Sequence, residues 1–265
     1  DVDGDIQQIN TTMARYLRKG QFREYPNSLI YVERRLDSGV LRRGLVGMVD
    51  LDQYDYEPGS GTLIRATEGT VLSRIPPRVA VRKNAPIELP HVMLLVDDPE
   101  KTTIEPLSAG KAEMIPVYDF ELMEHGGHVS GYLLNEEQKG RVESALSDLA
   151  DPEHFQRRYQ TESPVLLFAV GDGNHSLATA KECYERQKKL LPTERWPELP
   201  SRYALVELVN LHDESLKFEP IHRVLFGVDP GELLAELLKE YPGTHYGEGE
   251  GHSFRFICGR SEGII

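Results

Sequence analysis

Residues 163–176 read SPVLLFAVGDGNHS, and this stretch decides the fold class that the sequence predicts. The apolar run at 163–170 predicts a buried strand. The strand leads directly into Gly171-Asp172-Gly173-Asn174-His175-Ser176, and a helix is expected from about 177 to 190. Two glycines at the end of a buried strand let the backbone turn tightly and approach a ligand closely.

Outward from this junction, strands and helices follow one another without strict β-α-β alternation. Strands are expected at 28–36, 44–51, 91–96, 203–209 and 254–258, a hairpin over 113–134, and helices at 5–19, 135–149 and 230–241. The Pro76-Pro77 pair excludes a helix that runs continuously through 65–82. The pattern predicts an α+β (mixed α/β) fold, in one large domain over 1–265. The loops at 57–61 and 191–200 are the candidate internal boundaries.

Composition excludes several classes of protein. The 265 residues carry 43 acidic and 30 basic side chains, a net charge of -13, which argues against nucleic-acid binding. No apolar run approaches the ~20 residues that span a bilayer, and the polar first ten residues do not resemble a signal peptide. Cys183 and Cys258 lie far apart, so neither a disulfide framework nor a thiolate zinc site is expected. A reducing cytoplasm is the expected location.

The junction at 171–176 carries the clearest chemical signal. A helix start offers unpaired N–H groups and a partial positive charge, which favour an anion. Asp172 can hold a divalent cation or accept a proton, while His175 and Ser176 can donate to phosphate oxygens. The alternative is an ordinary capped helix, in which Asp172 or Asn174 satisfies the first-turn N–H groups and His175 faces solvent. The segment is neither a Walker loop nor a GxGxxG fingerprint.

Two further segments could face an anion. The sequence RATEGTVLSRIPPR at 65–78 combines one carboxylate, Glu68, with three arginines, Arg65, Arg74 and Arg78. The planar guanidinium suits phosphate or carboxylate, although a solvated loop with internal ion pairs explains the same pattern. His222-Arg223 precedes the apolar residues 224–226, and an ordinary strand or helix start explains that pair nearly as well.

Three segments together resemble a widespread bacterial and archaeal family of unknown function, often labelled SpoOJ-like or ParB-like. They are RATEGTVLSRIPPR at 65–78, VGDGNHSLATA at 170–180 and PIHR at 220–223. The resemblance extends from about residue 45 to residue 226. It implies a ParB/sulfiredoxin-like core with additional strands and helices. Members usually have further sequence at both ends, so it also implies that this chain is a fragment.

The commoner family form of the central motif is Asp-Gly-His-His-Arg. A similar loop in the archaeal ADP-dependent free serine kinase holds nucleotide phosphates and magnesium. The resemblance would make Asp172 the magnesium-linked acid, Gly173 the tight turn and His175 a phosphate donor. This chain has Asn174 and Ser176 where the common form has His and Arg. The missing charge would then come from elsewhere: Arg74, Arg78 or Arg223.

The leading hypothesis is a small-molecule phosphotransferase or phosphate- and nucleotide-handling enzyme, with an activity like that of a free serine kinase. Its catalytic residues would be Asp172, His175 and Glu68, with Mg²⁺ on Asp172 and ADP or ATP as the nucleotide. The expected binding residues are Gly171, Gly173, Asn174, Ser176, Arg65, Arg74, Arg78, His222 and Arg223.

Two alternatives stay open. One is a ParB-like nucleotide-binding regulatory module without metabolic catalysis, although residues 177–265 lack a basic helix-turn-helix pattern. The other is a non-catalytic binding protein with a degenerate site, which the Asn174 and Ser176 departures support. All three hypotheses expect a small molecule or nucleotide as the partner, and neither nucleic acid nor membrane.

Overall fold

The computed structural model describes residues 1–217 and 222–265 of the chain. Two compact units are present, Asp1–Lys217 and Phe218–Ile265. The loops at 57–61 and 191–200 both lie inside the first unit. In the second unit, helix α6 (Pro230–Glu240) accompanies an antiparallel hairpin of β10 (Arg255–Cys258) and β11 (Ser261–Ile264).

In the described part of the first unit, one mixed sheet of nine strands has the order β3-β4-β8-β5-β9-β2-β1-β7-β6. Its strands are β1 (Ile30–Arg35), β2 (Leu41–Asp50), β3 (Tyr54–Asp55), β4 (Ile64–Arg65), β5 (Val92–Val96), β6 (Ile115–Glu121), β7 (His128–Leu133), β8 (Phe168–Asp172) and β9 (Tyr203–Asn210). Strand β5 is parallel to β9 and antiparallel to β8. With its helices, this sheet confirms the mixed α/β class.

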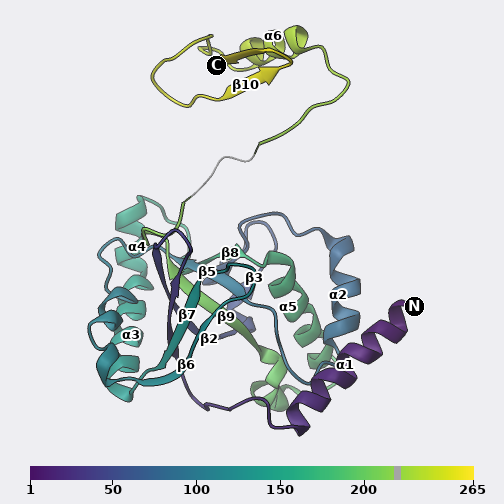
Figure 1. The fold of residues 1–265 in the computed structure, drawn as a ribbon, viewed down its shortest axis with the longest axis vertical. Helices are drawn as coiled ribbons and strands as arrows, with labels where there is room; N and C mark the ends of the chain where they lie inside the picture. Colours follow the sequence, from purple (N-terminus) through teal and green to yellow (C-terminus); the bar gives the residue numbers. More distant parts are fainter. Residues whose placement is uncertain (218–221) are drawn as a thin grey trace. The chain divides into compact units, whose positions relative to one another are not determined.

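Helices lie on both sides of the strands. In the view of Figure 1, α3 (Glu136–Leu149) and α4 (Pro152–Tyr159) lie to the left of the sheet, and α5 (Asn174–Lys188), α2 (Ile75–Arg82) and α1 (Val2–Arg18) lie to the right. Short 3-10 helices occur at Leu51–Gln53, Leu72–Arg74, Glu105–Ser108, Lys111–Glu113, Thr193–Glu198 and Pro200–Arg202. None of the described helices combines the length and apolar character that crossing a membrane requires.

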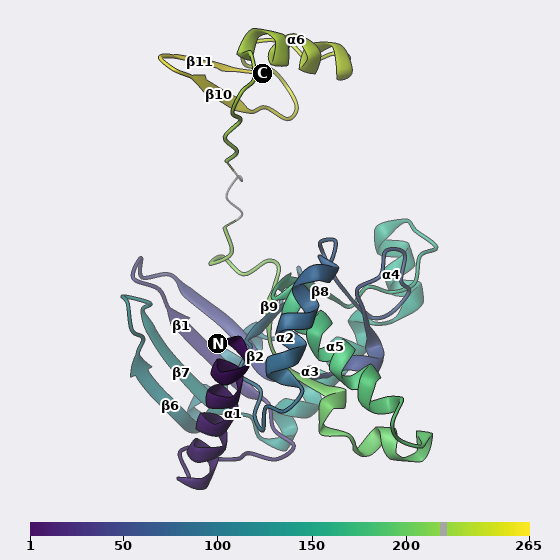
Figure 2. The same ribbon diagram turned by 90° about the vertical axis from the view of Figure 1, so that its right-hand side faces the viewer.

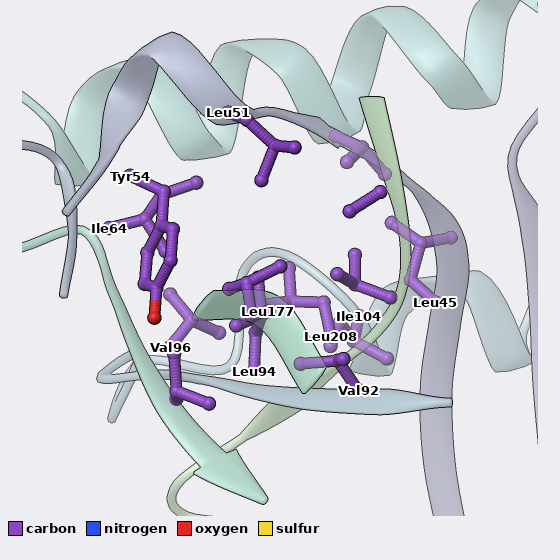
Figure 3. Packing of buried hydrophobic residues seen from close by; sticks show 14 of the residues in the cluster. Leu45, Leu51, Tyr54, Ile64, Val92, Leu94, Val96, Ile104, Leu177 and Leu208 are labelled. Atoms are coloured by element: carbon purple, nitrogen blue, oxygen red, sulfur yellow. The ribbon is translucent and has the colours of Figure 1, made fainter. Parts of the chain in front are cut away.

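The main core joins the sheet to helix α5. Figure 3 shows Leu177 of α5 among Leu94, Val96 and Leu208 of the sheet and Ile104. A smaller cluster packs α2 against α5 through Ile75, Val79, Ala178 and Cys183. The two helices accordingly lie side by side in Figures 1 and 2. This packing fixes the segment before α2 near the start of α5.

Local signals explain most element boundaries. Asn135 caps α3 with a full capping box, as its position predicts. Pro76 and Pro77 lie in the first turn of α2, where proline is tolerated, so they start a helix as well as blocking a longer one. Helix α4 is not among the expected elements, although Asp151 accepts a hydrogen bond from His154 N at its start.

The boundaries predicted around the central junction are wrong by several residues. Strand β8 begins at Phe168 rather than 163, since Pro164 cannot donate to a ladder. It continues through Gly171 because Asp172 still pairs with Met93 of β5. Helix α5 begins at Asn174 rather than near 177, so His175 and Ser176 belong to its first turn.

Candidate functional site

The turn between β8 and α5 is closed by Gly173. Its backbone is left-handed, with φ +94° and ψ 23°, a conformation that glycine adopts without strain. A Cβ at this position would lie 3.1 Å from Val92 Cγ2 and 3.3 Å from Val92 Cα. The turn is therefore pressed against the first residue of β5, and both geometry and space favour glycine here.

The start of α5 has no side-chain cap. Asn135, Asp151 and Asp229 cap α3, α4 and α6, whereas the N-cap of α5 is Gly173, which offers only its carbonyl. That carbonyl accepts from Leu177 N at 2.9 Å. Within the described residues, neither Asp172 nor Asn174 bonds the first-turn amides, so the capped-helix alternative is wrong. The N–H groups of residues 174–176 keep their capacity for an anion.

Asn174 uses its side chain to dock the preceding arginine-containing segment. It is 5% exposed, its Oδ1 accepts from Thr67 N at 3.2 Å, and its Nδ2 donates to Thr67 Oγ1 at 3.2 Å. Thr67 Oγ1 donates in turn to Val170 O at 2.6 Å. The segments 65–78 and 170–180, which only resemblance linked in the sequence, are thus joined around the helix start.

His175 makes a second attachment to the same loop. Its Nε2 accepts a hydrogen bond from Val71 N at 3.3 Å, and its side chain is 14% exposed, so it does not simply face solvent. Because Nε2 accepts, the neutral ring carries its proton on Nδ1. That nitrogen lies 3.8 Å from Glu68 Oε1. The predicted catalytic pair Glu68 and His175 is therefore close together.

The three arginines of the segment differ in their environment. Arg65 donates from Nε to Thr62 O at 2.7 Å and from its terminal nitrogen to Pro164 O at 2.8 Å and Val165 O at 2.7 Å. Burial lowers the pKa of this guanidinium below its ordinary value. Arg65 thus holds β4 to the chain before β8 and is not available to a ligand in this arrangement.

Arg74 and Arg78 are exposed at the start of α2. Arg78 donates to Arg74 O at 2.9 Å, a bond that leaves most of its donors open to solvent. His222 and Arg223 belong to the second unit, and the first two residues of the PIHR segment, 220–221, lie outside the described residues.

Comparison of the sequence with family models gives a match that covers nearly the whole chain. A family described as "Protein of unknown function (DUF1015)" matches residues 1–262. The chain belongs to this DUF1015 family. No curated protein matches the chain, and no solved structure matches it. The architecture and site geometry of this DUF1015 chain therefore rest on its own structure.

The sequence reasoning missed a second group of polar residues in this DUF1015 chain, centred on Glu207 of β9. This carboxylate is 2% exposed in the middle of the sheet. Its Oε2 is hydrogen-bonded to His91 Nε2 and lies 3.4 Å from Arg42. Burial raises the pKa of Glu207, but the His91 hydrogen bond and the Arg42 charge outweigh it and hold that pKa below its usual value. A lone glutamate within the apolar run 203–209 is the signal that could have revealed it.

The described residues contain no group of three or more His, Cys, Asp or Glu side chains arranged to hold a metal. Magnesium does not require such a cage, because it commonly binds through one or two carboxylates together with phosphates and water. The exposed Asp172 therefore fits a magnesium ion that arrives with a nucleotide, and it does not fit a resident structural metal.

Asn174 gives the first testable consequence. We expect Asn174→Ala to lower the free energy of unfolding by about 1–3 kcal/mol, because two polar groups of Thr67 lose their buried partner. Urea unfolding measures this loss, and amide hydrogen exchange at Thr67 and Val71 should accelerate. Ser176→Ala, two residues along the same helix turn, is the matched control. Equal effects of the two substitutions would contradict the docking role of Asn174.

Proposed function

We propose that this DUF1015 protein is a small-molecule phosphotransferase that binds a nucleotide phosphate group at residues 171–176. The observation that carries the proposal is the uncapped start of α5, whose free amides lie beside the exposed Asp172 and beneath a loop docked by Asn174 and His175. Phosphoryl transfer depends mainly on positioning and on positive charge around the phosphoryl oxygens. Main-chain N–H groups and the helix dipole provide that environment without a lysine.

The remaining roles follow from exposure and chemistry. Asp172 would hold the magnesium ion, which would neutralise charge on the phosphate oxygens. Arg74 and Arg78, exposed at the start of α2, would supply the charge that the Ser176 position lacks. Glu68, beside His175, is a candidate base for the acceptor hydroxyl. Arg65 has no ligand role in this proposal because its guanidinium is bound to three carbonyl groups.

Calorimetry tests the binding step. Titration with ATP, ADP and CTP in the presence of magnesium should give binding to at least one nucleotide, and Asp172→Ala should weaken it at least ~10-fold, since a charge-assisted contact is lost. Asp37→Ala, an exposed acid in the turn after β1, is the matched control and should bind like the wild type. The proposal fails if none of the three nucleotides binds the folded protein.

Incubation with L-serine tests the acceptor that the resemblance to free serine kinase suggests. Phosphoserine formed from ATP or ADP, followed by phosphorus NMR, would support the kinase-like activity. Nucleotide binding without transfer to any acceptor would favour the ParB-like regulatory alternative. Magnesium removal by chelation should abolish transfer, and added magnesium should restore it.

A further inference from the structure

A buried carboxylate in the middle of a sheet requires an explanation. Glu207 lies on β9 between apolar neighbours, and the chain leaves room for it at Gly44, where a Cβ would lie 2.3 Å from Glu207 Oε1. Replacing a buried ion pair by apolar groups is often neutral or stabilising, so stability alone gives little reason for this arrangement. The carboxylate also faces the charge of Arg34 and lies close enough to Tyr118 to raise the pKa of that phenol further above the value set by burial.

The orientation of His91 resembles that of a positioned base. The Glu207 side chain is 3% exposed and the His91 side chain is 52% exposed, so a buried carboxylate holds a solvent-facing imidazole. Because the carboxylate accepts from Nε2–H, the neutral ring presents the lone pair of Nδ1. No protein group in the described residues bonds that nitrogen. An ion pair with a half-exposed histidine contributes little stability, which leaves orientation as its main effect.

The sheet places this pair next to the proposed phosphate site. Met93 of β5 pairs with Asp172 of β8 on one side and with Glu207 of β9 on the other. Two strand spacings, ~10 Å, therefore separate the backbones of Asp172 and Glu207. His91 directly precedes Val92, against which the Gly173 turn is pressed. Val92 faces the core with Leu177 of α5, whereas Glu207, between the core residues Val206 and Leu208, faces the other side of the sheet. The imidazole and the start of α5 thus lie at the same end of the sheet.

We infer that His91 is the general base of the phosphoryl transfer and that Glu207 is the residue that positions it; the inference rests on the proposed function. In the step, Nδ1 of His91 takes the proton of the acceptor hydroxyl as its oxygen bonds to the terminal phosphorus of the nucleotide. The bond from phosphorus to the bridging oxygen breaks, and the shortened nucleotide leaves with that electron pair. The imidazolium then returns its proton to solvent.

Glu68 is the rival base, and variants separate the two. His91→Gln keeps an amide donor able to reach Glu207 but removes the base, while Glu68→Gln removes the rival carboxylate. We expect His91→Gln to bind nucleotide within twofold of the wild type and to lower the single-turnover rate of transfer to L-serine ~100-fold or more. Glu68→Gln should lower that rate less than His91→Gln does, and His154→Gln, at an exposed position of α4, is the matched control that should keep the wild-type rate. A full rate in His91→Gln, with binding and transfer intact in the wild type, overturns the inference and leaves the proposed function standing.

A split between kcat and KM distinguishes positioning from a structural role of Glu207. Glu207→Gln replaces a carboxylate that only accepts by an amide that can also donate, so the ring is no longer held with its proton on Nε2. We expect kcat to fall ~10-fold or more while KM for the nucleotide stays within twofold. An unchanged kcat in the folded variant overturns the positioning role. Urea unfolding curves show whether the variant is folded, and Glu207→Asp, which keeps the charge but withdraws it from the ring, replaces it if it is not.

Two outcomes without turnover are also decisive. If the wild type binds nucleotide but forms no phosphoserine, the imidazole resonances of ¹⁵N-histidine-labelled protein are followed while magnesium-ATP and L-serine are added. Unchanged His91 resonances then overturn the inference, and a shift of Nδ1 supports it. If the wild type binds no nucleotide, the proposed function fails first and the inference fails with it.

Discussion

Arg42→Met is expected to lower the free energy of unfolding by about 3 kcal/mol at pH 7, because it leaves the buried Glu207 carboxylate with one cationic partner fewer. Urea unfolding measures the loss. Arg141→Met is the matched control: its partner, Glu137, lies one helical turn away, and both side chains are well exposed. Such a surface pair contributes at most ~1 kcal/mol, so the control should unfold almost as the wild type does.

The deficit of Arg42→Met should depend on pH with a definite sign. In the wild type the pKa of Glu207 is lowered on folding, so its stabilising contribution is present above the ordinary carboxyl pKa, about 4.3, and is lost as pH falls below it. In the variant, the Arg42 charge no longer counteracts the effect of burial on the carboxylate, so the pKa of Glu207 rises. The protonated carboxyl then suits its buried position, so the difference between variant and wild type should shrink between pH 7 and pH 4. A constant difference over that range would contradict the ionised state of Glu207.

Gly127→Ala should have the other large effect. Gly127 precedes β7 with φ +83°, and a Cβ there would lie 2.0 Å from Arg35 O, a main-chain atom that cannot rotate away. Left-handed strain costs about 1–2 kcal/mol and overpacking about 1–3 kcal/mol, so we expect a loss of about 3 kcal/mol or more in urea unfolding. Gly39→Ala is the matched control, since Gly39 has φ +81° and nothing within 4 Å of its Cβ position.

The comparison of the two glycines separates strain from collision. Gly39→Ala should lose only about 1–2 kcal/mol, the conformational part. Similar losses in both variants would show that the β6–β7 turn moves freely away from β1. The carbonyl of Gly126 also accepts both hydrogen bonds of Arg34, at 3.1 Å and 2.9 Å. Gly127→Ala should therefore disturb the guanidinium that faces Glu207 as well.

Local chemistry accounts for the parts of the fold that the sequence could predict. Asn135 followed by Gln138 specifies the start of α3 through a capping box, and the apolar run at 203–209 becomes β9. The two-residue strands β3 and β4 carry too few residues for any period to appear. Strand order depends on contacts between distant segments, such as β8 with β4 and β5, and no local pattern encodes those.

The strand-to-helix junction of the candidate site was predictable from the sequence, whereas the contacts of its side chains were not. Residues 171–176 do form a strand-to-helix corner, yet Asn174 and His175 use their side chains to hold a loop rather than facing a ligand. Arg65 is tied to backbone carbonyls because the chain before β8 happens to pass beside β4. The contacts of Glu207 could not be predicted because its partners, His91 and Arg42, are each more than 110 residues away in the sequence.

The docking of the loop at 67–71 has a consequence for how this protein can diversify. Asn174 and His175 accept hydrogen bonds from the main-chain nitrogens of Thr67 and Val71, so apart from the Thr67 hydroxyl the docking does not depend on the side chains of the loop. Mutations at Gly69 and Thr70 can accumulate while the loop stays docked on the start of α5, but proline at position 71 is excluded because it lacks the N–H. The loop sequence can therefore change without changing the hydrogen bonds that hold the loop on α5.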